Sequence, residues 1–391
     1  MKVTSIVGAR PQFIKLAPFM RVCSEETGGN GISHSVIHSG QHYDYEMDRV
    51  FFEQLGIPAP EHNLAVGSGS HGWQMGEMMI KMERIFIEDP PDMALVYGDT
   101  NTTLAGALVA AKLHIPLAHV ESGLRSFNRR MPEEINRILT DHSSDLLFVP
   151  TIEAVRNLKN EGIGNSLFEG ELIDIELTET DLSGSEFPMV VNVGDIMFDS
   201  VLHALEIAEG TSTILDSLEL RTEPYFLATI HRAENTDDLS RLTSILKALS
   251  RLSEKTPIVF PAHPRTRKIL DGSPELTSMI QGLHIIEPVG YFDMLILMKN
   301  ALKILTDSGG MQKEAYYLKV PCVTMRDETE WVETLEKGYN VLVGTVEEDI
   351  IQKALTEFVP REGSYEEAYF GDGRSAQRMS KLISLFQGKQ K

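Results

Sequence analysis

The sequence predicts an α/β protein in which two doubly wound, Rossmann-like domains face a central cleft. Short apolar runs alternate with longer amphipathic stretches, the pattern of parallel strands joined by helical crossovers. A second series of this kind begins after the middle of the chain, and 391 residues exceed what one hydrophobic core usually organises. Ligands of open α/β sheets bind outside the carboxyl ends of the strands, so the cleft is the expected ligand site.

The expected strands fall into two sets. The first comprises residues 3–7, 35–38, 93–97, 117–120 and 146–149, and the second residues 225–230, 258–262, 284–286, 304–306 and 322–325. We therefore predict an amino-terminal domain over residues 1–190 and a carboxyl-terminal domain over residues 191–367. The helical spacing of Met379, Leu382, Ile383 and Phe386 predicts that residues 368–391 contain a closing helix, which packs back on the amino-terminal domain.

Residues 165–188, between the two halves, form an acidic insertion. They include seven acidic residues and neither lysine nor arginine. Ile173, Ile175 and Leu177 alternate with acidic side chains, as in a half-exposed strand. This pattern favours a surface hairpin over a disordered acidic tail.

The composition argues against several classes of protein. No apolar run approaches the roughly 18 residues that a membrane span needs, and the first strand runs directly into Gly8 and is too short for a signal peptide. A net charge of −21 disfavours nucleic acid and anionic membranes as partners. Cys23 and Cys322 lack the spacing of a metal or redox site, so we expect reduced thiols, a cytoplasmic protein and no bound metal.

The first strand ends in a turn suited to an anion. Gly8 permits close backbone approach, and the following helix points its positive amino end at the cleft. Arg10 and Lys15 add positive charge there, although they can also serve only to solvate the helix start. The turn is not GxGxxG, so the dinucleotide fingerprint is missing and we expect no nicotinamide cofactor.

The stronger ligand signal is Asp307-Ser308-Gly309-Gly310, which follows an apolar strand and opens a helix. Ser308 and the two glycines can offer a hydroxyl and backbone N–H groups to a diphosphate. Glu314, one turn later, can accept hydrogen bonds from ribose hydroxyls. The alternative is a plain strand-to-helix turn capped by Asp and Ser.

Three carboxylates follow strands of the first domain and are predicted to face the cleft: Asp99, Glu121 and Glu133. Asp99 and Glu133 can also be ordinary carboxylates at helix amino ends. Glu121 follows its strand directly, which makes it the best single candidate for acid–base work.

Two histidines stand at strand ends in the second domain. His231 and the segment His263-Pro264-Arg265 can meet a phosphate there. Metal ligation is the weaker alternative, because no HExxH motif or matched Asp/His set accompanies them.

Taken together, these segments resemble the non-hydrolysing UDP-N-acetylglucosamine 2-epimerases, and the resemblance covers nearly the whole chain. Its most specific stretches are GDTNTTLAG from Gly98, HVESGLRSFNRRMPEEINR from His119, HRAEN from His231 and LTDSGGMQKEA from Leu305. It implies a GT-B architecture, an active site between the domains, a UDP-sugar substrate and, usually, a homodimer.

The resemblance also implies residue roles. Arg10, Lys15, Asp99, Glu121, Glu133 and His231 become active-site candidates, and Ser308, Gly309, Gly310 and Glu314 become UDP-binding candidates. The implied reaction removes the proton on sugar carbon 2 as UDP departs, giving a 2-acetamidoglucal. Reprotonation on the opposite face, with return of UDP, gives the manno epimer. Which carboxylate is acid and which is base stays open.

Departures from the family wording leave the substrate open. Many members read GTRPE and TERPE, whereas this chain has Gln12 and Trp331 at the corresponding positions. That wording, together with VGDIMFD from Val193, looks like the branch that acts on UDP-2,3-diacetamido-2,3-dideoxyglucuronate. Gln41-His42-Tyr43 match only part of the region where many bacterial members bind a second UDP-N-acetylglucosamine as an activator.

Three other functions compete with the non-hydrolysing reaction. A GT-B glycosyltransferase holds UDP in much the same place, and a hydrolysing epimerase releases the sugar. A non-catalytic sensor binds a sugar nucleotide without reacting. The group of first-domain carboxylates argues against the transferase.

Overall fold

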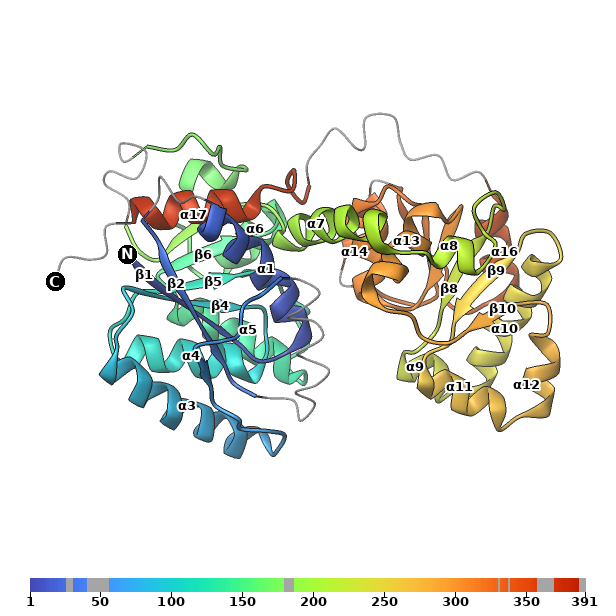
Figure 1. The fold of residues 1–391 in the computed structure, drawn as a ribbon, viewed down its shortest axis with the longest axis horizontal. Helices are drawn as coiled ribbons and strands as arrows, with labels where there is room; N and C mark the ends of the chain where they lie inside the picture. The colour runs from blue at the N-terminus through green and yellow to red at the C-terminus, as the bar shows by residue number, and fades with distance from the viewer. Residues whose placement is uncertain are drawn as a thin grey trace. The chain divides into compact units, whose positions relative to one another are not determined.

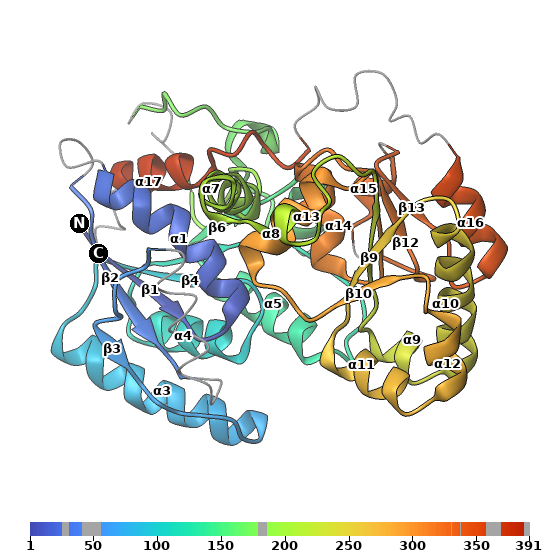
Figure 2. The ribbon, with the colours of Figure 1, turned by 45° about the vertical axis from the view of Figure 1, so that its right-hand side comes forward.

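The computed structural model describes residues 1–25, 31–40, 56–178, 186–329, 331–336, 338–356 and 369–386. The chain divides into two compact units, drawn in Figures 1 and 2, and each is described by itself. Unit 1 comprises residues 1–200 and 368–391, and unit 2 comprises residues 201–367. The boundary between the units thus falls inside helix α7 (Ile196–Thr211), whereas the sequence predicted it at residue 190. Within the described ranges, no helix has the length and apolar character needed to cross a bilayer.

Unit 1 is built on a seven-stranded parallel sheet with the order β3-β2-β1-β4-β5-β6-β7. The five predicted strands are present, and β3 and β7 are additional. The strands are β1 (Lys2–Val7), β2 (Ser33–His38), β3 (His62–Asn63), β4 (Met93–Tyr97), β5 (Leu117–Val120), β6 (Leu146–Val149) and β7 (Met189–Asn192). The central strands are almost wholly buried, as expected when helices cover both faces of a parallel sheet.

Helices cover both faces of this sheet (Figure 1). One face packs against α1 and α17, and the other against α3 and α4. The described helices are α1 (Arg10–Glu25), α3 (His71–Glu88), α4 (Asn101–Lys112), α5 (Pro132–Ser143), α6 (Ile152–Asn160), a 3₁₀ turn at Leu167–Gly170 and α17 (Ser375–Leu385). Local signals start several of them: Thr100 and Thr151 cap α4 and α6, and Pro132 opens α5.

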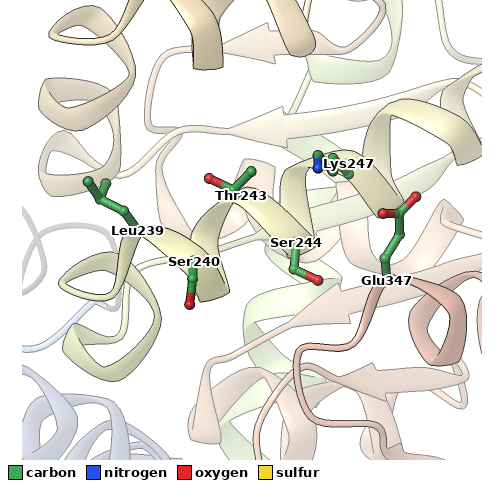
Figure 3. Close-up of a pocket in the computed structure, with 6 residues that line it drawn as sticks. All are labelled: Leu239, Ser240, Thr243, Ser244, Lys247 and Glu347. Carbon is green, nitrogen blue, oxygen red and sulfur yellow. The ribbon is translucent and has the colours of Figure 1, made fainter.

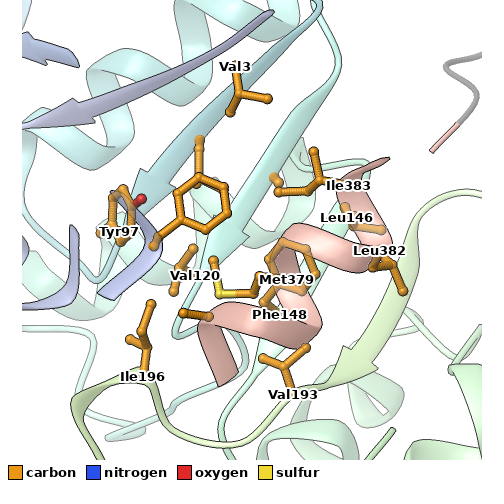
Figure 4. Close-up of a cluster of buried hydrophobic side chains, with 14 of the residues drawn as sticks. Val3, Tyr97, Val120, Leu146, Phe148, Val193, Ile196, Met379, Leu382 and Ile383 are labelled. Carbon is orange, nitrogen blue, oxygen red and sulfur yellow. The ribbon is translucent and has the colours of Figure 1, made fainter. Parts of the chain in front are cut away.

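Helix α17 returns from the end of the chain to the core of unit 1 (Figure 4). Met379, Leu382 and Ile383 are fully buried in one cluster with strand residues such as Phe148. Burying a side chain of this size contributes about 1.5–3 kcal/mol. The Asp199 carboxylate accepts the first backbone N–H groups of α17, at 3.1 Å and 2.8 Å, so α7 and α17 are joined at this point.

The described part of the acidic insertion does not form the predicted hairpin. Residues 171–178 contain no strand, although Ile173 and Leu177 are buried in the core cluster. The Ile173 N–H donates to the Asn192 carbonyl, and the Ile173 carbonyl accepts from Arg378 at 2.6 Å. The alternation therefore reflects single side chains packing inward along an irregular segment, so the hairpin prediction is wrong here. Residues 179–185 lie outside the described ranges.

Unit 2 repeats this plan with a six-stranded parallel sheet in the order β10-β9-β8-β11-β12-β13. Its strands are β8 (Phe226–Thr229), β9 (Ile258–Pro261), β10 (His284–Ile286), β11 (Lys303–Thr306), β12 (Cys322–Thr324) and β13 (Asn340–Leu342). Only β13 was not predicted. The helices are α8 (Ile214–Ser217), α9 (Ala233–Thr236), α10 (Leu239–Ser253), α11 (Pro264–Asp271), α12 (Pro274–Met279), α13 (Tyr291–Asn300), α14 (Gly309–Tyr317), α15 (Val332–Glu336) and α16 (Glu347–Leu355).

Each sheet has a point at which the strand order reverses. The reversal lies between β1 and β4 in unit 1 and between β8 and β11 in unit 2. Connections on the two sides of such a point leave in opposite directions and open a crevice at the carboxyl ends of the strands. The predicted site residues of both units follow these strands or their immediate neighbours.

Candidate active site and nucleotide site

The centre of the unit 1 site is a buried ion pair between Lys15 of α1 and Glu121, which directly follows β5. The Lys15 ammonium contacts Oε2 of Glu121, and the two side chains are 9% and 11% exposed. Gly98, at the end of β4, lies against the pair: a Cβ there would stand 3.2 Å from Lys15 Nζ and 3.4 Å from Glu121 Oε2. Lys15 and Glu121, which the sequence marks separately, are thus in contact.

Glu121 has an unusual backbone conformation. Its φ is +68°, in the left-handed region that residues other than glycine rarely adopt. Such residues cost about 1–3 kcal/mol and persist where the surrounding structure enforces them. The surrounding structure therefore holds this strained residue, with its carboxylate against Lys15.

Asp99 belongs to a second charged group beside this pair. Arg137 of α5 donates to Asp99 Oδ2 from Nε at 3.0 Å and binds Glu134 from Nη1 at 2.7 Å. Glu134 is buried and accepts the backbone N–H groups of Ser126 and Phe127, both at 2.9 Å. Burial would raise the pKa of Glu134, but these hydrogen bonds and Arg137 outweigh it and hold the pKa below its usual range.

Glu133 differs from its neighbour Glu134. It is exposed in the first turn of α5, and no contact joins it to Asp99 or Glu121. Consecutive helix residues point about 100° apart, and in α5 Glu134 faces inward while Glu133 faces outward. The sequence had no signal for Glu134 apart from its i,i+3 spacing to Arg137.

Gln12 explains how the β1–α1 turn is built. Its amide oxygen accepts the N–H groups of Gly8 and Ala9 at 2.8 Å and 3.1 Å, and its nitrogen donates to the Tyr97 carbonyl at 2.9 Å. Gln12 is 1% exposed. It therefore takes up two N–H groups that the sequence suggested for an anion. Arg10 begins α1, but its side chain is outside the described part of the structure.

In unit 2, Asp307 organises the loop that carries His231. Asp307 follows β11 and is fully buried. Its carboxylate accepts the backbone N–H groups of His231 and Arg232 at 3.0–3.1 Å and the amide of Asn235 at 3.2 Å. Its acceptor oxygens are therefore directed into the protein, and Asp307 holds together the ends of β8 and β11.

The His231 ring stands at this same strand end. Its Nδ1 lies 3.3 Å from Asp307 Oδ1, and its side chain is 36% exposed. Burial lowers the pKa of His231, an effect that Asp307 opposes and His263 and Arg232 reinforce. Asp307 thus orients the His231 imidazole from the buried side, and the opposite side of the ring is accessible to solvent.

Ser308, Gly309 and Gly310 begin helix α14. Ser308 is the N-cap, and its hydroxyl accepts the Met311 N–H at 3.4 Å. Gly310 is exposed, and a Cβ there would meet nothing closer than the Ser308 hydroxyl at 4.0 Å. The amino end of α14 is therefore open to an anionic ligand.

Glu314 lies one turn further along α14. Burial raises the pKa of its carboxyl to about 7, against the opposing influence of Tyr291 and Lys313. The buried Tyr291 hydroxyl is near enough to affect Glu314 without reaching hydrogen-bonding geometry. A carboxyl with this pKa changes charge in the neutral range.

This pKa predicts a pH dependence of nucleotide binding. Below about pH 7 the Glu314 carboxyl is neutral, and above it the carboxylate can accept charge-assisted hydrogen bonds from ribose hydroxyls. We expect UDP affinity to rise about threefold to tenfold from pH 6 to pH 8 in the wild type, and this gain to be absent in Glu314→Gln. Calorimetric titration of both proteins at both pH values separates Glu314 from the titration of UDP itself. Equal gains in the two proteins would contradict the assignment.

The ionisation of Glu314 also affects folding, with a definite sign. Its folded pKa lies above the ordinary value of 4.5, so the folded unit binds the proton more tightly than the unfolded chain does. This contribution to stability is present below pH 4.5 and is lost as the pH rises to about 7.

Trp331 packs on Lys313 of α14. The Lys313 ammonium lies 4.0 Å from the centre of the Trp331 ring, and Lys313 is 4% exposed. Gln312 fixes the segment before Trp331, because its amide oxygen accepts the Thr329 hydroxyl at 2.6 Å. Trp331 and the buried Lys313 thus form a cation–π pair.

His263 and Arg265 flank the His231 loop. The ring centres of His231 and His263 are 5.6 Å apart. The Arg265 guanidinium binds Asp237 at 2.5 Å and 2.7 Å and is 44% exposed. His263 is brought beside His231, whereas Arg265 is engaged in a surface ion pair.

An open pocket of about 490 Å³ lies on the outer side of α10, and Figure 3 shows its lining side chains. Its lining residues are Leu239, Ser240, Thr243, Ser244, Lys247 and Glu347. None of the predicted site residues lines it. Across the described residues, no group of three or more His, Cys, Asp or Glu side chains is arranged to hold a metal ion.

The chain is similar to known proteins over nearly its whole length. The family model for UDP-N-acetylglucosamine 2-epimerase matches residues 25–384. A UDP-N-acetylglucosamine 2-epimerase homolog of Methanococcus maripaludis is 50% identical, over 98% of this chain and 99% of its own. The UDP-2,3-diacetamido-2,3-dideoxy-D-glucuronate 2-epimerase of Pseudomonas aeruginosa is 44% identical, with the same coverage of both chains.

Solved structures extend the likeness to the fold. The UDP-GlcNAc 2-epimerase of Methanocaldococcus jannaschii, in complex with UDP-GlcNAc and UDP, matches with a TM-score of 0.76 and 42% identity, over 99% of this chain and 100% of that one. UGT2 of Phytolacca americana, complexed with UDP-2fluoro-glucose and pterostilbene, matches with a TM-score of 0.57 at 11% identity, so that likeness shows the fold alone. The fold class predicted from the sequence is confirmed. The chain belongs to the UDP-N-acetylglucosamine 2-epimerase family, and the protein is an isomerase of GT-B fold.

Proposed function

We propose that this protein is a non-hydrolysing epimerase that inverts carbon 2 of UDP-N-acetylglucosamine to give UDP-N-acetylmannosamine. The observation that best supports this is the buried Lys15–Glu121 pair beside Gly98. It presents a carboxylate from the end of β5 and an ammonium from α1, which follows β1, near the reversal of strand order between β1 and β4. That arrangement suits acid–base chemistry on a bound ligand.

The reaction needs a base that removes the proton from carbon 2 and an acid that returns one. The hydrogen on carbon 2 has no neighbouring carbonyl, so its removal must accompany loss of UDP from carbon 1. A carboxylate takes the proton while the carbon–oxygen bond breaks, and the electron pair of the C–H bond forms the double bond of a 2-acetamidoglucal. An acid then returns a proton to the opposite face of carbon 2, and UDP oxygen attacks carbon 1 again.

We assign these roles to residues as follows. Glu121 and Asp99 are the carboxylates for proton transfer, with Lys15 and Arg137 balancing their charge. Glu133 stays a candidate from the sequence resemblance alone. Each proton transfer contributes about 10²–10⁴ in rate.

We assign the departing UDP to unit 2. Ser308, Gly309 and Gly310 offer their helix start to the diphosphate, and His231 adds a polar ring beside it. Glu314 accepts the ribose hydroxyls. Stabilising the departing diphosphate is an electrostatic contribution comparable to the proton transfers.

The diacetamido uronate is the alternative substrate. It is favoured by the sequence wording around Trp331 and by the 44% identical relative that carries its name. Gln12 does not discriminate between the two substrates, because its amide is hydrogen-bonded within the β1–α1 turn and to the end of β4. Incubating the purified protein with each UDP-sugar separately and following carbon 2 by NMR decides between them. A kcat/KM at least tenfold higher for the uronate would reassign the substrate and keep the reaction.

We also propose that the protein is a homodimer joined through α3. Trp73, Ile80 and Ile87 are spaced seven residues apart on this helix and are 51%, 49% and 66% exposed. Apolar residues at this spacing share one side of a helix and suit packing against the same side of a second copy.

The dimer proposal predicts the effect of a single charge. Ile80→Glu should convert the protein to a monomer, because an uncompensated carboxylate would be buried in each half of the interface. Sedimentation velocity on the variant and on Leu239→Glu measures this. Leu239 is 61% exposed on α10 and serves as the matched control, which should stay dimeric. A dimeric Ile80→Glu protein would place the interface elsewhere.

We place the reaction in the cytoplasm. Cys23 and Cys322 are not joined by a disulfide, which is the usual state in a reducing compartment.

A further inference from the structure

A chain of charged side chains lies beneath the Glu121 loop and has no role in the proposed reaction. Nδ1 of His119 is 2.7 Å from Asp141 Oδ1, and Arg125 is 2.7 Å from Asp141 Oδ2. Arg125 continues to Glu161, also at 2.7 Å. His119 and Asp141 are fully buried and the Arg125 side chain is 1% exposed. Burying so many ionisable groups is costly, and their arrangement points to a purpose beyond stability.

Asp141 pins the Glu121 loop at both ends. Through Oδ1 it contacts His119, two residues before Glu121, and through Oδ2 it accepts the N–H of Gly123 at 3.1 Å, two residues after. Gly123 has a φ of +76°, and a Cβ there would stand 2.6 Å from the Ala154 carbonyl oxygen. One carboxylate on α5 therefore fixes the path of the chain through residues 119–123.

His119 extends this hold to the neighbouring strand end. Its Nε2 lies 2.8 Å from the Gly98 carbonyl oxygen, which can only accept, so this nitrogen carries a hydrogen. Its Nδ1 faces the Asp141 carboxylate at 2.7 Å. Gly98 is the residue against which Lys15 and Glu121 lie. Asp141 thus fixes the Glu121 loop directly and Gly98 through His119.

The charge state of Asp141 suits this arrangement. Burial alone would raise the pKa of Asp141, but the hydrogen bonds and charges of His119 and Arg125 outweigh it and hold the pKa below its usual range. Asp141 is therefore a carboxylate with both oxygens available as acceptors at neutral pH.

We propose that Asp141 is a positioning residue for epimerisation, which holds Glu121 in its left-handed conformation with its carboxylate against Lys15. The inference rests on the proposed function, because its readout is the proton transfer at carbon 2. The φ of +68° at Glu121 is strained, so the loop relaxes when its anchor is removed. Relaxation withdraws the carboxylate from the reacting carbon, and displacements of about 1 Å can cost about 100-fold in rate.

The test is Asp141→Asn, compared with Asp145→Asn. An amide keeps one acceptor oxygen and cannot serve both His119 and Gly123. We expect kcat to fall about 10- to 100-fold, with KM and the UDP dissociation constant within twofold of wild type. Asp145 is the matched control, because its carboxylate accepts the Leu117 N–H at 3.0 Å at the amino end of the same strand β5. Its variant should keep the wild-type kcat.

A second variant guards against misfolding of the first. His119→Gln removes the contact to Asp141 Oδ1 and should lower kcat in the same direction, again with unchanged UDP binding. A wild-type protein without carbon-2 exchange would refute the proposed function itself. If the wild type shows carbon-2 exchange and Asp141→Asn or His119→Gln shows it at the same rate per folded molecule, only the positioning role of Asp141 would be overturned.

Discussion

Replacing Glu121 by Gln is expected to lower kcat for epimerisation by about 10²–10⁴, with UDP affinity within threefold of wild type. Glu121 carries the carboxylate at the end of β5, one strand beyond the reversal between β1 and β4, and Gln keeps its size without its charge or basicity. UDP affinity is expected to persist, because the proposed UDP contacts belong to unit 2, which folds around its own sheet. Single-turnover kinetics and calorimetric titration of UDP measure the two quantities.

The control for this variant addresses Lys15. Glu121→Gln leaves the Lys15 ammonium buried without its partner, and breaking a buried pair in this way costs about 3–5 kcal/mol. The double variant with Lys15→Met removes both charges and should recover part of that loss in urea unfolding without recovering kcat. Wild-type turnover in Glu121→Gln would remove Glu121 from the catalytic residues. Recovery of turnover in the double variant would show that the single variant failed through instability.

Replacing Asp307 by Asn is expected to weaken UDP binding at least tenfold and to lower the free energy of unfolding of unit 2. The Asp307 carboxylate accepts hydrogen bonds from His231, Arg232 and Asn235. An amide supplies one acceptor and turns an NH₂ group toward these donors. Each hydrogen bond to a charged group contributes about 1.5–3 kcal/mol, so the loop that carries His231 should lose its position.

Asp293→Asn is the comparison for this loss. Asp293 also lies in unit 2, but its carboxylate accepts from the Ser212 hydroxyl at 2.5 Å, apart from the His231 loop. Urea unfolding and UDP titration should therefore place this variant close to wild type. Unchanged UDP affinity in Asp307→Asn would mean that the His231 loop has no part in holding the nucleotide.

The sequence marked Lys15 and Glu121 separately as candidates, and only the folded sheet shows their contact. The two residues are 106 positions apart, but each follows a buried strand of one parallel sheet, and carboxyl ends of such strands share an edge. The start of α14 was predictable from the sequence, because a strand followed by Ser and two glycines leaves a capped, open helix end. In that case a local pattern determined a position in the fold.

Other features depend on side-chain direction, which pattern alone does not supply. The motif PEE contains two glutamates, and the phase of α5 decides that Glu134 is buried and Glu133 exposed. Asp307 reads as a ligand residue, yet it faces inward because two backbone N–H groups across the sheet need an acceptor. The alternation at residues 173–177 imitates a strand, because single apolar side chains there pack into the core without a partner strand.

Three strands were not predicted; β7 has four residues, and the other two are shorter. β3 has two residues and β13 three, too short for a periodic pattern to stand out. Asp141 escaped notice because it lies in the last turn of helix α5, where a carboxylate gives no motif. Its role depends on contacts with residues 18 and 22 positions away.

The most direct test of the proposed reaction is NMR of UDP-N-acetylglucosamine incubated with the protein in heavy water. Elimination and re-addition predict that solvent deuterium enters carbon 2 of the sugar, that UDP-N-acetylmannosamine accumulates, and that the sugar stays attached to UDP after prolonged incubation. Release of free N-acetylmannosamine, or transfer of the sugar to an acceptor without deuterium at carbon 2, would contradict the proposal.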